Sequence, residues 1–232
     1  MKTLVICSGG MDSITLAHKI ADQGHLAHIL TFDYGQRHVK EVDFARDCAL
    51  RLGVPFTLID MANIGREFTG TALTDNVDVP DGHYQQANMA ITMVPNRNVI
   101  MLSIAYGLAA THKLKRVALA VHGGDHFIYP DCRPEFIEAF AKMQKLALAG
   151  HADIDIYAPY VNASKADIAL DAKRLGVDHA QSWSCYKGGE LHCGRCGTCV
   201  ERREAFDLAG YADPTIYADP NYWQSVVQKV AS

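Results

Sequence analysis

A loop close to the N-terminus carries residue types that suit phosphate binding. The segment "SGGMDS", residues 8–13, follows the apolar run "TLVIC" and precedes apolar residues at helical spacing. Small residues let backbone N–H groups converge on an anion at the start of a helix. The loop lacks the Gly-Lys-Ser/Thr ending of a Walker A motif and the third glycine of the dinucleotide fingerprint. Ordinary turns use the same residues, so composition alone leaves phosphate binding and a plain turn equally open.

Four cysteines near the C-terminus have the spacing of metal ligands. They lie within fifteen residues, among glycines and polar residues: Cys185, Cys193, Cys196 and Cys199. Four thiolates complete a tetrahedral shell around Zn²⁺ and leave no coordination position for a substrate. The spacing predicts one structural zinc ion, with an iron–sulfur cluster, a redox pair and reduced structural cysteines as weaker alternatives.

The other three cysteines stand alone in the sequence. Cys7 and Cys48 fall on an expected strand and an expected helix, where small buried side chains are the ordinary explanation. Cys132 lies beside Arg133 in a polar loop, and this neighbour leaves open a thiol of lowered pKa.

The elements that position these residues alternate between strand and helix. Apolar patterns predict strands at 3–7, 25–35, 55–60, 116–124 and 153–160, and helices at 14–24, 42–53, 98–113, 134–150 and 164–177. Connections of this length allow parallel pairing, so we expect an α/β fold whose parallel sheet has helices on both faces. Ligands collect at the carboxyl ends of such strands, where residues 8–13, 33–38 and 122–133 fall. Residues 63–95 lack periodicity and are expected to form a functional or mobile loop.

Composition places the chain among compact cellular proteins. The chain has 232 residues, 49% hydrophobic, with a net charge of −4 and a pI near 6.2. A length of this order suits one domain with a small appendage. The acidic balance disfavours stable nucleic-acid binding. Because neither a long apolar run nor a secretory leader is visible, we expect a cytoplasmic protein with no membrane contact.

Several motifs together resemble a known family. "SGGMDS" is similar to the pyrophosphate loop of the N-type ATP pyrophosphatases, which include GMP, NAD and asparagine synthetases and several tRNA-modifying ligases. Four further segments resemble, in order and spacing, one family of this group, the 7-cyano-7-deazaguanine synthases of the queuosine pathway. They are "TFDYGQRH" (31–38), "VPNRN" (94–98), "YPDCRPEFI" (129–137) and "SWSCYKGGELHCGRCGTCVERR" (182–203). The family more often has glycine at the position of Asn96, and asparagine tolerates left-handed backbone angles.

This resemblance implies a fold and a reaction. The fold would be of the adenine nucleotide alpha hydrolase type, Rossmann-like, over residues 1–180, with a zinc-binding segment over 181–232. The reaction would adenylate the carboxylate of 7-carboxy-7-deazaguanine with ATP, and ammonia would displace AMP to give an amide. A second ATP would activate the amide oxygen, and loss of AMP would leave a nitrile. The family also suggests a homodimer.

The resemblance and the chemistry together nominate site residues. The residues expected to bind ATP, with Mg²⁺ bridging its β- and γ-phosphates, are Ser8, Gly9, Gly10, Met11, Asp12 and Ser13. Those expected to carry catalysis are Asp12, Ser13, Arg97 and Lys165, the last two by neutralising phosphate charge. Those expected to bind the deazaguanine are Arg97, Asp125, Tyr129, Asp131 and Arg133, and Phe127 offers an apolar surface in the same loop.

A second loop at a strand end leaves several roles open. Tyr34, Gln36, Arg37 and His38 could serve the adenine, the ribose or ammonia, and His38 titrates near neutral pH.

Other functions remain as alternatives. A tRNA-modifying adenylating enzyme would be expected to carry a basic extension, and none is visible. A zinc-ribbon binding module would not need the large α/β portion. A related ligase that amidates another carboxylate, or stops at the amide, keeps the same chemistry.

Overall fold

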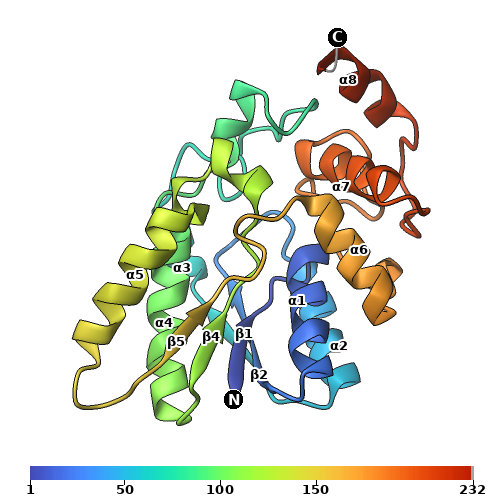
Figure 1. Cartoon of the computed structure of the whole chain (residues 1–232). Helices are drawn as coiled ribbons and strands as arrows, with labels where there is room; N and C mark the ends of the chain where they lie inside the picture. The colour runs from blue at the N-terminus through green and yellow to red at the C-terminus, as the bar shows by residue number, and fades with distance from the viewer. Residues whose placement is uncertain (231–232) are drawn as a thin grey trace.

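Five parallel strands form the central sheet of the structure, a computed structural model that describes residues 1–230 (Figure 1). The strands are β1 (Thr3–Ile6), β2 (Leu26–Asp33), β3 (Phe56–Asp60), β4 (Arg116–Ala118) and β5 (Asp155–Tyr157). Their order is β3-β2-β1-β4-β5, and every neighbouring pair is parallel. Residues 231 and 232, the end of the expected segment 181–232, lie outside the described residues.

Helices cover both faces of the sheet, which confirms the expected fold class. The helices that pack on the two faces are α1 (Met11–Asp22), α2 (Glu41–Leu52), α4 (Arg97–Thr111), α5 (Pro134–Ala147) and α6 (Lys165–Leu175). Side chains alternate along β1, so Leu4 packs in the core beneath α4 and α5 while Val5 packs in the core beneath α1, α2 and α6. Both residues are fully buried, and each face therefore has its own apolar core.

Local boundaries differ from the pattern in two places. The strands expected at 116–124 and 153–160 shorten to three residues each, because the chain then turns into the loops that reach the site. Within 63–95 the structure has one turn of helix, α3 (Ala62–Gly65), and a 3₁₀ helix, η1 (Ala87–Thr92). In α4, expected to be apolar on nearly every side, Ser103, Gly107 and Thr111 form an exposed stripe at a spacing of four.

The order of the strands fixes where the chain can bind a ligand. From the central strand β1 the chain proceeds outward through β2 and β3, and it later returns to the other side of β1 through β4 and β5. The loops that follow β1 and β4 therefore leave the sheet in opposite directions and open a crevice between them.

The C-terminal segment lies at the carboxyl ends of the strands. Its helices are α7 (Gly197–Leu208), which packs on α6, and α8 (Tyr222–Val230) (Figure 1). A small apolar cluster joins Trp183 and the cysteines to Ala72 and Val79 of the long loop. The helices described in residues 1–230 are all too short or too polar to cross a bilayer.

Candidate active site

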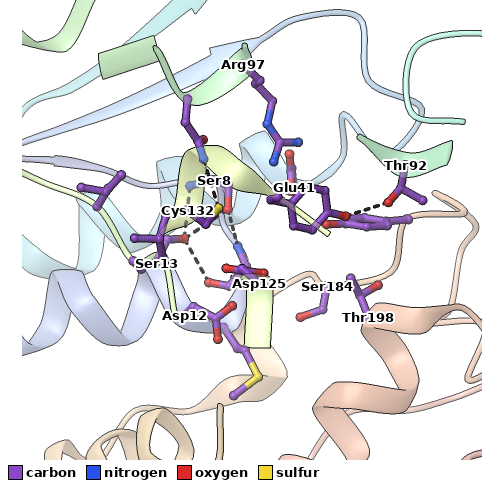
Figure 2. A pocket seen from close by; sticks show the side chains of 18 of the residues that line it. Ser8, Asp12, Ser13, Glu41, Thr92, Arg97, Asp125, Cys132, Ser184 and Thr198 are labelled. Carbon is purple, nitrogen blue, oxygen red and sulfur yellow. Dashed lines mark hydrogen bonds between the residues drawn. The ribbon is translucent and has the colours of Figure 1, made fainter. Parts of the chain in front are cut away.

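A pocket of about 240 Å³ opens at the carboxyl ends of β1 and β4 (Figure 2). It is lined by residues from five parts of the chain: the loop 8–13, the 32–41 region, the 79–102 region, the loop after β4, and the C-terminal segment together with Lys165. The pocket thus lies where parallel α/β sheets bind ligands.

The loop 8–13 is shaped by its own hydrogen bonds. Ser13 Oγ donates to the carbonyl of Gly10 (3.1 Å) and accepts from the N–H of Ser8 (3.1 Å). Gly10 caps the N-terminus of α1, whose free N–H groups attract anions. Gly9 has φ +94°, and a Cβ there would meet the carbonyl oxygen of Glu41 at 2.0 Å, so only glycine fits. The loop therefore offers an anion site at the floor of the pocket.

Lys165 and Asp12 form the centre of a charged cluster beside this loop. Lys165 Nζ lies 3.0 Å from Asp12 Oδ2 and 2.9 Å from Glu201 Oε2. Burial acts to lower the pKa of Lys165, but these carboxylates raise it overall, so the ammonium form is retained. Burial acts to raise the pKa of Asp12, but Lys165 and His122 lower it overall. Asp12 Oδ1 is buried and has no hydrogen-bond partner among residues 1–230.

His122 and Glu201 complete the cluster, and neither was nominated from the sequence. Gly124 N–H donates to His122 Nδ1 (3.1 Å), which leaves Nε2 facing the carboxylates of Asp12, Asp125 and Glu201 at 3.8, 3.6 and 3.9 Å. His122 opens the loop "HGGDHFIYPDCR", which was a signal that it lies near the site. Nothing in the pattern of α7 distinguishes Glu201 from a surface residue.

Arg97 lies across the pocket from this cluster. It is the first residue of α4, after Asn96, whose φ of 61° is in the left-handed region that asparagine tolerates. The guanidinium donates to Tyr34 Oη (3.1 Å) and lies over the Tyr34 ring. No ion pair within the described chain involves it, although it is half-buried. Because leaving a cation partly desolvated and unpaired is costly, Arg97 is suited to an anionic ligand.

The loop after β4 contributes some of the nominated residues and not others. Asp125 and Tyr129 line the pocket, and Tyr129 Oη hydrogen-bonds Thr92 Oγ1 (2.7 Å). Asp131 does not line it: its Oδ2 accepts from the N–H of Asn98 (3.0 Å) at the start of α4. Arg133 also lies outside the lining, where its Nε donates to the carbonyl of His126 (3.0 Å).

Cys132, Phe127 and Arg37 do not behave as reactive or recognition groups in this structure. Burial raises the pKa of the Cys132 thiol, so the lowered pKa considered from its neighbour Arg133 is wrong. Phe127 is 67% exposed. Arg37 is exposed, and its guanidinium donates to backbone carbonyls of the loop 63–95.

The loop after β2 places a buried carboxyl against the pocket. Gln36 Nε2 donates to Glu41 Oε1 (3.2 Å), and His38 Nε2 lies 3.5 Å from the same oxygen. Burial lowers the pKa of His38 to about 3, so it stays neutral near pH 7 and cannot carry the proton first considered for it. Burial raises the pKa of Glu41 to about 8. Sequence patterns gave no sign of Glu41, because its position resembles an exposed first turn of a helix.

The long loop 63–95 forms a wall of the pocket. Val79, Tyr84, Met89 and Thr92 line it. This wall is held to the cysteine segment by Asp81, whose two carboxylate oxygens accept from Lys187 Nζ (2.6 Å) and Arg195 Nε (2.8 Å), and by Gly82 N–H, which donates to the Arg195 carbonyl (3.0 Å). The loop is thus a built part of the site.

The four cysteines converge as their spacing predicts. One Sγ atom from each lies within 4.8 Å of all the others, so the set can hold a metal ion: Cys185, Cys193, Cys196 and Cys199. Backbone N–H groups of Arg195 and Cys196 donate to Cys193 Sγ (3.3 and 3.2 Å), which favours the thiolate form. Four soft donors with oriented N–H groups fit a closed tetrahedral site.

The fold and the pocket define an α/β protein of the Rossmann-like class, with a ligand pocket at the carboxyl ends of its parallel strands. Comparison of sequences then gives the family: the family model described as "Queuosine biosynthesis protein QueC" matches residues 2–210, and the chain belongs to this family. A 7-cyano-7-deazaguanine synthase of Brucella anthropi is 64% identical over 229 residues, 99% of each chain. The same enzyme of Brucella ovis is 63% identical over the same coverage.

Solved structures resemble the chain more distantly. A U34-tRNA thiolase NcsA from Methanococcus maripaludis, with its [4Fe-4S] cluster, is 17% identical with a TM-score of 0.49, and the match covers 100% of this chain and 71% of that one.

Proposed function

We propose that this chain converts 7-carboxy-7-deazaguanine, ammonia and ATP to 7-cyano-7-deazaguanine, AMP and pyrophosphate. Membership of the family and the high identity to synthases of this name support the substrate. The observation that carries the mechanism is the single pocket that joins an anion-binding loop to the unpaired guanidinium of Arg97. Such a pocket can hold a nucleotide phosphate and a second anion side by side.

ATP would bind through the loop 8–13. The N–H groups at the start of α1 and the hydroxyl of Ser13 would hold the β- and γ-phosphates, and Lys165 would neutralise charge as pyrophosphate departs. Mg²⁺ would enter with ATP and shield these phosphates, and the unpartnered Oδ1 of Asp12 is the kind of oxygen ligand that it prefers. Positioning and charge stabilisation, more than covalent chemistry, would drive the step.

The deazaguanine would bind on the other side of the pocket. Arg97 would hold the carboxylate near the α-phosphate, and attack there would give the acyl-adenylate. Asp125 and Tyr129 are the nominated residues that lie where they can contact the ring. Ammonia would displace AMP to give the amide. A second adenylation, of the amide oxygen, and loss of AMP would give the nitrile.

The cysteine cluster would hold one structural zinc ion. Four thiolates favour zinc among common cellular metals, and they would leave no open position for substrate. We further propose a cytoplasmic homodimer that does not bind nucleic acid stably; light scattering of the purified protein tests the dimer.

Product analysis tests the proposed function directly. The purified protein is incubated with ATP, Mg²⁺, ammonium and 7-carboxy-7-deazaguanine, and products are followed by mass. We expect the nitrile together with AMP and pyrophosphate. An amide that accumulates without nitrile would instead support a ligase that stops at the amide. If neither product forms, the proposal is wrong.

A further inference from the structure

Glu41 is a buried carboxyl group that the proposed steps do not yet use. It lies in the first turn of α2, with only 10% of its side chain exposed, and it lines the pocket with Ser8 and Arg97 (Figure 2). Its Oε1 is held by the amide of Gln36 at 3.2 Å. Its Oε2 forms no hydrogen bond with the part of the chain that is described. One oxygen is therefore fixed and the other is free for a ligand.

The groups around Glu41 leave it able to gain and lose a proton. Those that face it are neutral His38 and Gln36 from its own loop, Tyr34, Arg97 from α4 and Cys7 from the end of β1. Burial raises the pKa of Glu41, and the charge of Arg97 opposes this shift without cancelling it. The carboxyl thus has a high proton affinity for its type and lies beside the guanidinium that would hold the substrate carboxylate.

Amide formation needs such a group. In neutral water ammonia is mostly ammonium, which has no lone pair, so the attacking nitrogen must lose a proton at the site. Three other titratable side chains of the pocket are less suited. His38 is neutral with a very low pKa, the Cys132 thiol has a raised pKa, and Asp12 is paired with Lys165.

We propose that Glu41 is the general base that takes a proton from ammonium when the acyl-adenylate is converted to the amide. The carboxylate accepts one N–H proton, and the freed lone pair forms the C–N bond at the acyl carbon. The C–O bond to the adenylate then breaks, and AMP leaves with the electron pair. The second N–H proton passes to the released phosphate or to water. Glu41 returns its proton to solvent before the next turnover.

This inference rests on the proposed function, and two nucleophiles separate it from that function. Hydroxylamine is largely unprotonated at neutral pH, so it attacks the acyl-adenylate without a base and yields a hydroxamate. The isosteric variant Glu41→Gln is compared with the wild type in three assays: pyrophosphate exchange into ATP that depends on the deazaguanine, hydroxamate formation and amide formation from ammonium.

The expected result is a loss specific to ammonium. Glu41→Gln should keep pyrophosphate exchange and hydroxamate formation within about threefold, while amide formation at pH 8, where Glu41 of the wild type is partly ionised, falls about 100-fold, the usual scale of general-base catalysis. Above pH 8, where most of the wild-type Glu41 is already carboxylate, a further rise in pH supplies free ammonia and should narrow the deficit. An equal loss with both nucleophiles, or a loss of pyrophosphate exchange, would overturn the inference, and so would normal amide formation.

Two further variants serve as controls. Glu138→Gln changes an exposed carboxylate on α5 and should alter none of the three assays. Asp125→Asn neutralises another carboxyl of the pocket, half-buried beside His122, and should lower exchange and both products together. If Asp125→Asn alone shows the ammonium-specific loss, Asp125 is the base and our assignment is wrong. A wild-type protein without exchange would refute the proposed function itself.

Discussion

Individual side chains of the pocket differ in how many of their possible hydrogen bonds and ion pairs are formed with the protein itself. Among residues 1–230, Lys165 is paired with two carboxylates, whereas the guanidinium of Arg97 donates to a phenol oxygen alone and Asp12 Oδ1 has no hydrogen-bond partner. Leaving a buried charged group short of partners costs more than a typical hydrogen bond contributes. Such groups persist where a ligand completes them, so the free capacity of Arg97 suits an anion and that of Asp12 suits a cation.

Removal of the Ser13 hydroxyl is expected to stop activation. Ser13→Ala loses the bonds to Gly10 and Ser8 that hold the loop and a donor for phosphate. AMP formation should fall at least about 100-fold, as when a transition-state donor is deleted. Metal content and the unfolding temperature should stay near the wild-type values. Ser103→Ala, on the exposed stripe of α4, is the matched control; unchanged AMP formation in Ser13→Ala would contradict the role.

Glu41 also gives the protein a defined pH dependence of stability. Its pKa is raised from 4.5 to about 8 in the folded state, so the folded chain binds more protons than the unfolded chain between these values. The contribution of Glu41 to the free energy of unfolding should therefore decrease as pH rises from about 4.5 to about 8. Glu41→Gln removes this pH-dependent contribution. The free energy of unfolding of the variant, relative to that of the wild type, should therefore increase with pH across that window. Denaturant titrations at several pH values measure it; an advantage that shrinks with rising pH would contradict it.

At the scale of elements, the apolar pattern of the sequence predicted those strands and helices that depend on interactions within one segment. Strands β1 and β2 and helices α1 and α6 were found because their apolar periodicity, and Gly176 after α6, act within one segment. The roles of Glu201, His122 and Glu41 were missed because they arise from contacts between segments far apart in the chain. Asp131 shows the converse: its residue type suits recognition, yet the fold uses it to bond the first turn of α4.

The wall formed by residues 79–92 is expected to depend on Asp81. Asp81→Asn weakens the two charged hydrogen bonds to Lys187 and Arg195 that hold this wall to the cysteine segment. We expect the KM for the deazaguanine to rise about tenfold while kcat changes less, because the loop loses order before substrate binds. Steady-state kinetics measure this split. Asp78→Asn, exposed in the same loop, should leave both constants unchanged; an unaltered KM in Asp81→Asn would contradict the wall's dependence.

At the scale of the whole molecule, we expect the metal to stabilise the pocket without contacting its ligand. Cys196→Ala should lose the metal, expose the apolar cluster around Trp183 and make the protein aggregate. Metal analysis and the yield of soluble protein measure both effects. Cys48→Ala, on the buried face of α2, should keep its metal. A soluble, fully active Cys196→Ala protein without metal would contradict this expectation.

One hydrogen bond joins parts of the chain that are far apart in the sequence, and it bears on when the loop 8–13 becomes ordered during synthesis. The backbone N–H of Trp183 donates to the carbonyl of Gly9 (2.9 Å), so a residue that is made after all five strands braces a loop that is made before four of them. A growing polypeptide on the ribosome can form β1 to β5 early, but its nucleotide cradle stays unbraced until Trp183 emerges. Nascent chains stalled before this residue should fail to bind immobilised ATP, whereas chains stalled beyond residue 230 with a linker should bind it. If the loop binds ATP as proposed, we expect affinity for ATP only after Trp183 has been made.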